Sequence, residues 1–535
     1  MPETSRPNHQ RQNPTSRGTT GLYEMRQNPR DSGPSHSTRR TPRFPLRNIR
    51  RFRNLPNGAI AAPHRPPQPA PRDADALSVP PQCYQHRRRK AAAALTVIWG
   101  GTLTLHLISW GAWLLWGLGG VLTLHALRVL FADPRRGEIE PEPAGDDWPF
   151  VSLLVAAKNE EAVIGNLVKN LCNLDYPAHC YELWVIDDNS SDRTPSVLDE
   201  LAGRYRQLNV LRRDETATGG KSGALNQVLP LTRGEIVGVF DADAQVAPDL
   251  LRHVVPEFRA ARVGAVQLQK AIANASFNFW TRSQAAEMAL DAFFQKQRVA
   301  VGGIGELRGN GEFVRRRALE TCGGWCEETI TDDLDLTLRL HLDRWDIAFL
   351  DRAVVFEEGV TGPRALWHQR NRWAEGGYQR YLDYGKFLLG DRLNFGKKVD
   401  LFGFLVTQYL LPMAAVPDLL LSAILRRPPV TTPITLLAVT LSLFGMFVGL
   451  RRSLGTVKPL PDAPAEGATE TSETGDRTPN FPRVSYVTTL FQTLRGTVYM
   501  FHWLIVVAST TVRISVRPKR LKWVKTVHQG TPDRP

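Results

Sequence analysis

Short apolar runs alternate with amphipathic stretches between residues 148 and 390, and this pattern predicts strands that alternate with helices. Helices are expected over 160–174 and 195–204. Strands that alternate with helices form a mainly parallel sheet covered on both faces, whose ligands gather at the carboxyl ends of the strands. The sequence therefore predicts an α/β domain over 148–390, with strands in FVSLLVAAKN (150–159), YELWVIDD (181–188), LNVLRR (208–213), EIVGVFDAD (235–243) and GAVQLQ (264–269).

A much longer apolar stretch precedes this domain. Residues 91–127 contain no Lys, Arg, Asp or Glu. A single helix of this length would extend ~55 Å, well beyond the ~30 Å hydrocarbon core of a bilayer. We therefore expect a transmembrane hairpin over 91–132 with a tight turn near Trp110 and Gly111. Basic residues on both flanks place both of its ends, and the α/β domain, on the cytoplasmic side.

The chain becomes apolar again over 399–515, where a polar linker is expected at 451–483. The segment 401–425 is interrupted by Pro412, Pro417 and Asp418, whereas 434–450 and 498–512 are cleaner but short. Three full crossings would leave the basic tail 516–535 on the outer side, against the positive-inside tendency. One segment is therefore expected to be interfacial or re-entrant, and an interfacial position suits 401–425 in a multi-pass membrane protein.

The net charge of +14 resembles that of a nucleic-acid binder, but its distribution along the chain favours another interpretation. Residues 1–90 hold 18 basic and 5 acidic side chains, so the rest of the chain is close to neutral. This Pro- and Arg-rich segment is expected to be a disordered cytoplasmic tail. Arg87 to Lys90 either contact anionic lipid headgroups or form a topogenic cluster on a solvated tail, and the second interpretation is favoured. Five scattered cysteines indicate neither a zinc site nor a disulfide framework.

Candidate chemistry begins with two acidic clusters at predicted strand ends. LWVIDD ends in Asp187 and Asp188, and IVGVFDAD ends in Asp241 and Asp243. In an extended segment, residues two apart point to one side, so Asp241 and Asp243 can share a hard divalent cation such as Mg²⁺ or Mn²⁺. A lone Asp-x-Asp is weak evidence because turns favour Asp. Two such clusters in one sheet favour a binding site.

The glycine-rich stretch TGGKSGALN (218–226) lies between the two acidic clusters. Its glycines allow close backbone approach to a ligand, and Lys221 can supply positive charge to a diphosphate. It lacks the Walker A spacing, and alone it would read as an ordinary helix-entry loop. Beside the two Asp clusters it fits a nucleotide-sugar pocket.

The ordered set VAAKNEE, VIDDNSSD, GGKSGALN, FDAD, ITDDLDLTLRL and HQRNRWAEGGYQRYL resembles the family 2 glycosyltransferases, which include cellulose, hyaluronan and poly-N-acetylglucosamine synthases. The resemblance covers about 150–385 and implies a Rossmann-like GT-A fold and inversion at the anomeric carbon. It also implies roles for individual residues. By this resemblance, Asp188 binds the uracil end of the donor, and Asp241 and Asp243 bind the sugar nucleotide and the metal. Asp333 is the catalytic base. The Q-x-x-R-W signature, which lies beside the diphosphate and the acceptor, is formed by Gln369, Arg372 and Trp373.

Two adjacent carboxylates, Asp332 and Asp333, stand in the TDD triplet, where the resembling synthases usually have Thr-Glu-Asp. If both point inward, Asp332 raises the proton affinity of Asp333 and moves a weak base toward working pH. Alternatively, Asp332 faces solvent or caps the following helix. The capping interpretation is favoured, because consecutive residues at a helix start point in different directions.

Three functions fit these motifs, and they differ in the acceptor that receives the sugar, if any. AEGGYQRYLDYGKFLL, EETITDDLDLTLRLHLDRW and the apolar hairpin resemble the cyanobacterial diacylglycerol glucosyltransferases. That resemblance implies transfer from UDP-glucose to the free hydroxyl of 1,2-diacylglycerol, giving β-monoglucosyldiacylglycerol for glycolipid synthesis. The alternative is a processive polysaccharide synthase, which the few helices after the catalytic domain disfavour. A non-catalytic membrane scaffold is disfavoured because every titratable group that the mechanism needs is present.

Overall fold

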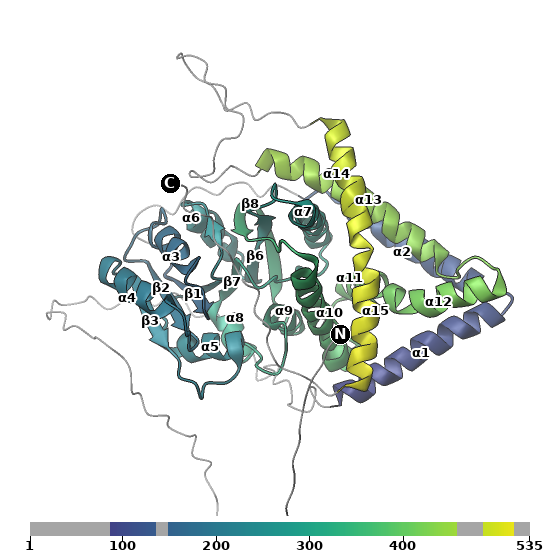
Figure 1. Ribbon diagram of the computed structural model, residues 1–535, viewed down its shortest axis with the longest axis horizontal. Coiled ribbons are helices and arrows are strands. Elements are labelled where there is room, and N and C mark those ends of the chain that lie inside the picture. Colours follow the sequence, from purple (N-terminus) through teal and green to yellow (C-terminus); the bar gives the residue numbers. More distant parts are fainter. Residues whose placement is uncertain (1–85, 135–147, 457–484, 518–535) are drawn as a thin grey trace, which may run out of the picture. The chain divides into compact units, whose positions relative to one another are not determined.

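The computed structural model describes residues 86–134, 148–456 and 485–517 (Figure 1). Nearly all of the expected N-terminal tail, most of the polar linker and nearly all of the basic C-terminal tail lie outside these residues. The described part contains an α/β domain and a set of apolar helices, which come before and after it in the chain (Figure 1).

The α/β domain is built on one eight-stranded sheet in the order β3-β2-β1-β4-β7-β6-β8-β5. Strands β3, β2, β1 and β4 are parallel neighbours, and β7 runs antiparallel to both β4 and β6. The predicted α/β class with a largely parallel sheet is therefore confirmed, with each expected strand present. The strands are β1 (Val151–Ala157), β2 (Tyr181–Asp187), β3 (Leu208–Arg212), β4 (Ile236–Phe240), β5 (Gln245–Val246), β6 (Val263–Ile272), β7 (Glu312–Arg315) and β8 (Asp346–Glu357).

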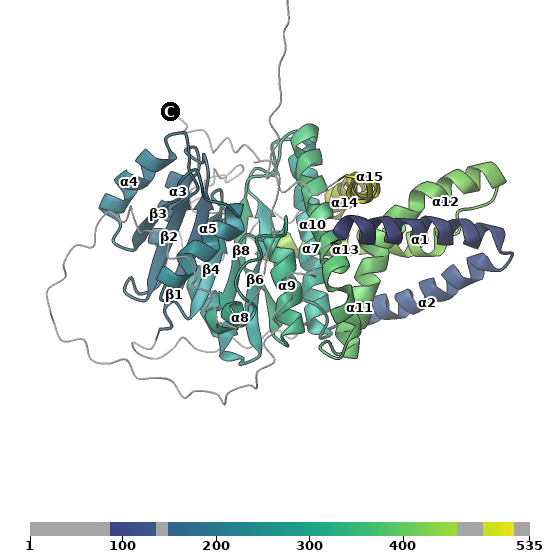
Figure 2. The same ribbon diagram turned by 90° about the horizontal axis from the view of Figure 1, so that it is seen from below.

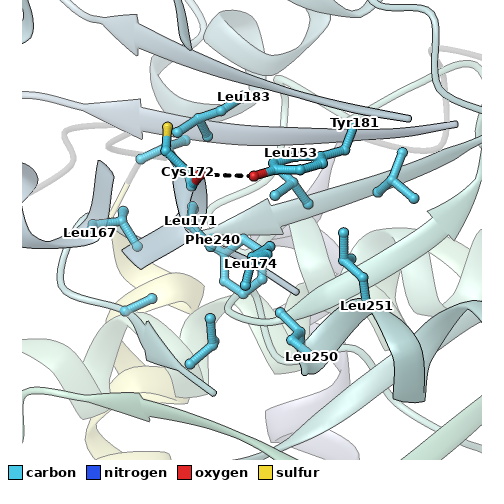
Figure 3. Close-up of a cluster of buried hydrophobic side chains, with 14 of the residues drawn as sticks. Leu153, Leu167, Leu171, Cys172, Leu174, Tyr181, Leu183, Phe240, Leu250 and Leu251 are labelled. Carbon is cyan, nitrogen blue, oxygen red and sulfur yellow. Dashed lines mark hydrogen bonds between the residues drawn. The ribbon is translucent and has the colours of Figure 1, made fainter. Parts of the chain in front are cut away.

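Helices pack on this sheet and bury an apolar core. Figure 3 shows Leu153, Leu183 and Phe240 from three strands beside Leu167 and Leu171 of α3. Burial of each such side chain stabilises the fold by roughly 1.5–3 kcal/mol. The helices of this domain are α3 (Ile164–Cys172), α4 (Thr194–Arg204), α5 (Gly220–Val228), α6 (Leu250–Val254), α7 (Phe279–Ala300), α8 (Arg316–Thr321), α9 (Asp332–Leu342) and α10 (Pro363–Leu389).

The expected N-terminal hairpin is present as α1 (Arg87–Leu107) and α2 (Gly111–Leu130). Its turn falls at 108–110, as predicted, and Gly111 is required there because an added Cβ would lie 2.1 Å from the Leu105 carbonyl oxygen. Within the described ranges, four helices are long and apolar enough to cross a membrane. They are Gly111–Leu130, Phe395–Leu425, Thr432–Ser453 and Tyr486–Val516, so α1 is not among them.

The segment 401–425 differs from the expected interrupted one. Helix α11 (Phe395–Leu405) continues through a π-helical turn (Val406–Leu410) into α12 (Leu411–Leu425). Asp418 is fully buried, and its carboxylate accepts hydrogen bonds from the backbone N–H groups of Val430 and Thr431. It also lies 2.7 Å from Nε2 of His106. Because the Asp418 carboxylate has hydrogen-bond partners inside the protein, this polar residue does not end the helix.

The last two apolar segments are longer than predicted. Helix α13 (Thr432–Thr456) includes the first six residues assigned to the linker. The Arg451 guanidinium lies 4.1 Å from the centre of the Tyr486 ring, which joins α13 to α14. Helices α14 (Tyr486–Met500) and α15 (His502–Val516) begin twelve residues before the predicted apolar run, because Gln492 and Arg495 break the hydrophobic pattern without breaking the helix.

Candidate functional site

The glycine-rich loop places Lys221 at the start of α5, beside the end of β4. Gly219 has a φ of +83°, and the helix begins directly after it. Nζ of Lys221 donates to Oδ1 of Asp241 at 2.5 Å and to the Gly309 carbonyl at 2.8 Å. Burial alone would lower the pKa of Lys221, but the neighbouring carboxylates raise it overall, so the ammonium stays charged.

The Asp-x-Asp pair does not have the extended conformation that the sequence predicted. Strand β4 ends at Phe240, and residues 241–244 form a turn in which the Ala244 N–H donates to the Asp241 carbonyl at 3.1 Å. The side chain of Asp241 is 41% exposed, whereas Asp243 is buried and accepts from the Glu358 N–H at 2.8 Å. The turn forms because the sheet ends there, and it gives the two carboxylates different surroundings.

The side chains near Asp241 limit how a metal ion could bind here. Within the described residues, no group of three or more His, Cys, Asp or Glu side chains is placed to hold a metal ion. Asp241 offers a hard carboxylate oxygen beside a charged lysine, a donor type that suits Mg²⁺ or Mn²⁺ when water and phosphate oxygens fill the other positions. The donor set fits a cation that binds together with a diphosphate.

Asp332 and Asp333 open α9, and both face inward. The N-cap of α9 is Thr331, whose side chain makes no capping hydrogen bond. Oδ2 of Asp332 is buried and has no hydrogen-bond partner within the described part of the chain. Asp332 therefore neither occupies the N-cap position nor faces solvent, although its carboxyl accepts hydrogen bonds from the backbone N–H groups of Asp332 and Asp333 in the first turn. Burial and then the neighbouring charge of Asp332 raise the pKa of Asp333 to about 6, as the other interpretation required.

A carboxyl group that the sequence analysis missed lies beside this pair. Glu312, the first residue of β7, is 1% exposed, and burial followed by Asp332 and Asp333 raises its pKa to about 8. The preceding loop approaches the base closely, because a Cβ on Gly309 would lie 3.3 Å from Oδ2 of Asp333. The sequence EFV (312–314) is typical of an ordinary strand. Only the glycines of RGNGE (308–312) indicate that the backbone approaches a site closely here.

The Q-x-x-R-W helix α10 contributes two of its three predicted residues to this cluster. Burial lowers the pKa of Arg372, and the charges of Asp241 and Asp333 act against this shift, so Arg372 lies near both carboxylates. Lys270, another residue not predicted, pairs with Glu357 at 2.7 Å and lies 5.7 Å from the centre of the Trp373 ring. The site therefore contains the predicted cation Arg372 near the aspartates and the unpredicted cation Lys270 near Trp373.

Gln369 is placed differently from the prediction. Its Oε1 accepts from Nη1 of Arg370 at 2.9 Å. Arg370 is fully buried, lies 4.1 Å from the centre of the Trp373 ring and pairs with Glu287 at 2.5 Å. In this arrangement Gln369 supports the arginine that holds Trp373, and none of its described contacts is with the aspartates.

Asp188, directly after β2, is paired with two basic side chains. Its Oδ1 accepts from Nη1 of Arg213 at 2.5 Å, and Lys158 lies 3.6 Å from its other oxygen. Arg213 also donates to the carbonyls of Thr218 and Gly220. Arg213, which was not predicted, thus ties Asp188 to the glycine-rich loop that carries Lys221.

Arg87 departs from the expected solvated basic cluster. It is 6% exposed, pairs with Asp383 of α10 at 2.6 Å and donates to the Glu328 carbonyl at 2.7 Å. The Glu328 carbonyl precedes the TDD triplet by three residues. Arg87 therefore links α1 to α10 and to the segment that precedes the predicted base, Asp333.

A cavity of about 350 Å³ leads from this cluster into the apolar helices. At one end it is lined by Asp333, Lys270, Arg308 and Trp373. Its other walls come from α2, α7, α11, α13 and the α14–α15 pair. This cavity could not be predicted from the sequence, because its lining residues are spread from Leu122 to Val507.

An Asp332→Asn variant tests the electrostatic coupling of the two aspartates. Removing the Asp332 charge lowers the pKa of Asp333, so the ionised form persists to lower pH. We expect the acid limb of the pH–rate profile to move to lower pH in this variant. An Asp199→Asn variant, altered on the exposed face of α4, should keep the wild-type profile. An acid limb that stays in place or moves to higher pH would refute the coupling.

Comparisons with known proteins agree with this arrangement. Residues 149–376 match the family model described as glycosyltransferase like family 2. The chain is 59% identical over 455 residues to the β-monoglucosyldiacylglycerol synthase of Trichormus variabilis, covering 85% of this chain and 92% of that protein. It is 55% identical over 446 residues to the synthase of the same name from Synechocystis sp., covering 83% of this chain and 88% of that protein.

Among solved structures, the mannosyltransferase PcManGT of Pyrobaculum calidifontis, in complex with GDP-Man and Mn²⁺, aligns with a TM-score of 0.47 and 22% identity. The alignment covers 80% of this chain and 99% of that one. At this level of similarity the ligands of that complex carry no argument for the present site.

Proposed function

Because this chain belongs to the family 2 glycosyltransferases, in the group of the β-monoglucosyldiacylglycerol synthases, we propose that it transfers glucose from UDP-glucose to the free hydroxyl of 1,2-diacylglycerol. The fold is a GT-A-like α/β domain joined to apolar helices, and the protein is membrane-associated. The single observation that carries the proposal is the cavity that leads from Asp333 into those helices, because an acceptor from the bilayer needs such a route.

Asp333 acts as the general base. Its pKa of about 6 leaves it mainly ionised at neutral pH while keeping it basic enough to accept the proton of a hydroxyl. The hydroxyl oxygen attacks C1 of the glucosyl group from the face opposite the departing diphosphate. Inversion of the donor's α linkage then gives the β-linked lipid.

Positive charge gathers where the leaving diphosphate develops negative charge. Lys221 and Arg372 lie beside Asp241, and they stabilise the phosphate oxygens as the bond to C1 breaks. Mg²⁺ or Mn²⁺ held by Asp241 and Asp243 would supply further charge at the diphosphate. Asp188 binds the uracil end of the donor, and Trp373 forms a wall of the site, while Gln369 supports Arg370 behind it.

The cavity also bears on the alternative of a processive polysaccharide synthase. A growing sugar chain needs polar partners along its path, because buried hydroxyls without hydrogen bonds are costly. The walls from α2 and α13 present Leu122, Val129, Leu437 and Leu441 instead. Polar side chains line the cavity along α7, and these apolar walls opposite them favour a lipid acceptor that receives one sugar.

Labelled UDP-glucose and diacylglycerol, incubated with the purified full-length protein, test this function. The expected product is a one-sugar lipid that partitions into organic solvent, and UDP-galactose and UDP-N-acetylglucosamine should give less of it. Insoluble polymer as the main product would support the processive alternative. Absence of both products, with folded protein and added Mg²⁺ or Mn²⁺, would reject both functions.

The arrangement of the apolar helices supports a specific topology. Helices α1, α2 and α12 project in the same direction in both views, with α1 packed on α12, whereas α15 crosses their bases and is seen end-on in Figure 2. A helix that crosses a bundle cannot share its membrane normal. Helix α15 also binds α10, since Arg513 pairs with Glu375 at 3.3 Å and Thr510 donates to Oδ1 of Asn371 at 2.9 Å.

The position of α10 fixes the depth of α15. Helix α10 carries seven charged residues besides His368 within its 27 positions, so it is unsuited to the hydrocarbon core. We infer that α14–α15, although long and apolar enough to cross, lies in the membrane interface in place of the segment 401–425 expected there. Helices α2, α11–α12 and α13 cross, and α1 crosses as the partner of α2 in the hairpin, although its basic first turn keeps it out of the set of four. Four crossings return the chain to its starting side, which keeps the catalytic domain and both basic tails in the cytoplasm. Exposed Arg88 and Arg89 at the start of α1 then face anionic headgroups.

Single cysteines at Ser485 and Arg517, in a cysteine-free background, test this topology. The two positions flank α14–α15. In sealed vesicles of one orientation, a membrane-impermeant maleimide should label both from the same side. Labelling from opposite sides would show that the helix pair spans the bilayer.

A further inference from the structure

Helix α13 is held at two separate close approaches. Near its start, an added Cβ on Gly119 of α2 would lie 3.2 Å from Cβ of Pro433. Further along, an added Cβ on Gly445 would lie 2.6 Å from the ring of Phe294, and one on Gly449 would lie 2.2 Å from the Ala289 carbonyl oxygen. Helix α13 is therefore fixed against α2 at one end and against α7 at the other.

The two turns between these approaches face the cavity. Leu437, Ala438, Leu441 and Ser442 line it from α13, opposite Ala126 of α2. Small side chains at three of these positions leave the space open, and the fixed ends of α13 prevent it from closing. A volume of about 350 Å³ falls within the range of roughly 300–1,000 Å³ typical of ligand sites.

The wall formed by α7 is polar. Glu287, Asp291, Gln295 and Arg298 recur every three or four residues along α7, and all four line the cavity. Asp291 pairs with Arg308 at 2.7 Å, beside the Asp333 end. The cavity thus has a polar wall that begins near the base and an apolar wall that faces it, which suits a molecule with a polar head and hydrocarbon chains.

We propose that the α13 segment Leu437–Ser442 binds an acyl chain of the diacylglycerol acceptor and sets the chain length that the enzyme accepts. This inference rests on the proposed function. The glycerol backbone lies along the polar wall of α7, with its free hydroxyl at Asp333. The acyl chain lies between α13 and α2, where burial of each methylene contributes about 0.8 kcal/mol.

A Leu441→Trp variant fills the acyl site and tests the proposal. With dipalmitoylglycerol, kcat/KM should fall about ten-fold or more, whereas with the short-chain dihexanoylglycerol it should change less than about two-fold. The matched control is Leu436→Trp, because Leu436 lies on the same helix and is 57% exposed. This control should keep the wild-type ratio of the two acceptors.

If the wild-type enzyme makes the one-sugar lipid, the proposed function stands, and two outcomes would still contradict the acyl site on α13. One is a Leu441→Trp enzyme with the wild-type long-to-short ratio, and the other is an equal loss with both acceptors. A measurement on the wild-type protein covers the case of a misfolded variant. A diacylglycerol with a photoreactive group at the end of one acyl chain should label peptides that contain 437–442 or 122–129. Labelling confined to outer-face residues such as Leu436 would also overturn it.

Discussion

An Asp333→Asn enzyme is expected to lose about 10²- to 10⁴-fold in kcat, the usual contribution of a general base. The amide keeps the size of the side chain but cannot accept the proton of the attacking hydroxyl. Because Asp333 lines the proposed acceptor cavity beside Lys270 and Arg308, and is not among the residues proposed to hold the diphosphate, binding of the donor should change little. The measurement is single-turnover transfer to diacylglycerol, with donor affinity measured separately.

The matched control for this variant is Asp199→Asn. Asp199 is 69% exposed on α4 and pairs only peripherally, with Arg212 of β3. It should transfer glucose at the wild-type rate. An Asp333→Asn enzyme with wild-type kcat would show that the base is another residue, and Glu312 would then be the first to examine, since it lies among the same charges.

An Asp241→Asn enzyme is expected to lose about 100-fold or more in kcat/KM for the donor, the scale of one lost electrostatic contact at a developing anion. Asp241 is the carboxylate that faces the site and pairs with Lys221. Its loss should also raise the Mg²⁺ or Mn²⁺ concentration needed for half-maximal activity. Activity titrated against the metal ion, after removal with EDTA, provides the measurement.

Asp243 supplies an informative comparison. An Asp243→Asn side chain can still accept the Glu358 N–H hydrogen bond, so the turn after β4 should stay folded. If Asp243 also binds the metal, its variant should show the same altered metal requirement as Asp241→Asn. Unchanged metal dependence in both variants would contradict a cation site at this turn, and full activity in excess EDTA would do the same.

The parts of the site that follow from one strand or helix could be predicted from the sequence. Asp188 and Asp241 follow strands whose carboxyl ends meet at one edge of the sheet, so a shared site was predictable. Lys221 could be placed because its glycines mark a close approach at a helix start. The hairpin was predictable because 37 uncharged residues exceed one bilayer crossing.

Features that depend on helix phase or on distant segments could not be predicted. The direction of Asp332 depends on α9 beginning at that residue instead of one later, which its sequence does not fix. Glu312 looks like an ordinary strand residue until the fold brings the two carboxylates at the start of α9 near it. The cavity needs α2, α7 and α13 together, and the interfacial position proposed for α14–α15 depends on the neighbouring α10.

The configuration of the product's anomeric carbon reports whether Asp333 drives a single displacement at C1. If the Asp333 carboxylate deprotonates a lipid hydroxyl that attacks C1 in a single displacement, every turnover inverts the α-linked donor. The proton NMR coupling of the anomeric hydrogen in the purified glucosyl lipid should therefore report a β linkage. An α-linked glucosyl lipid would contradict the account, because no single displacement at this site could produce it.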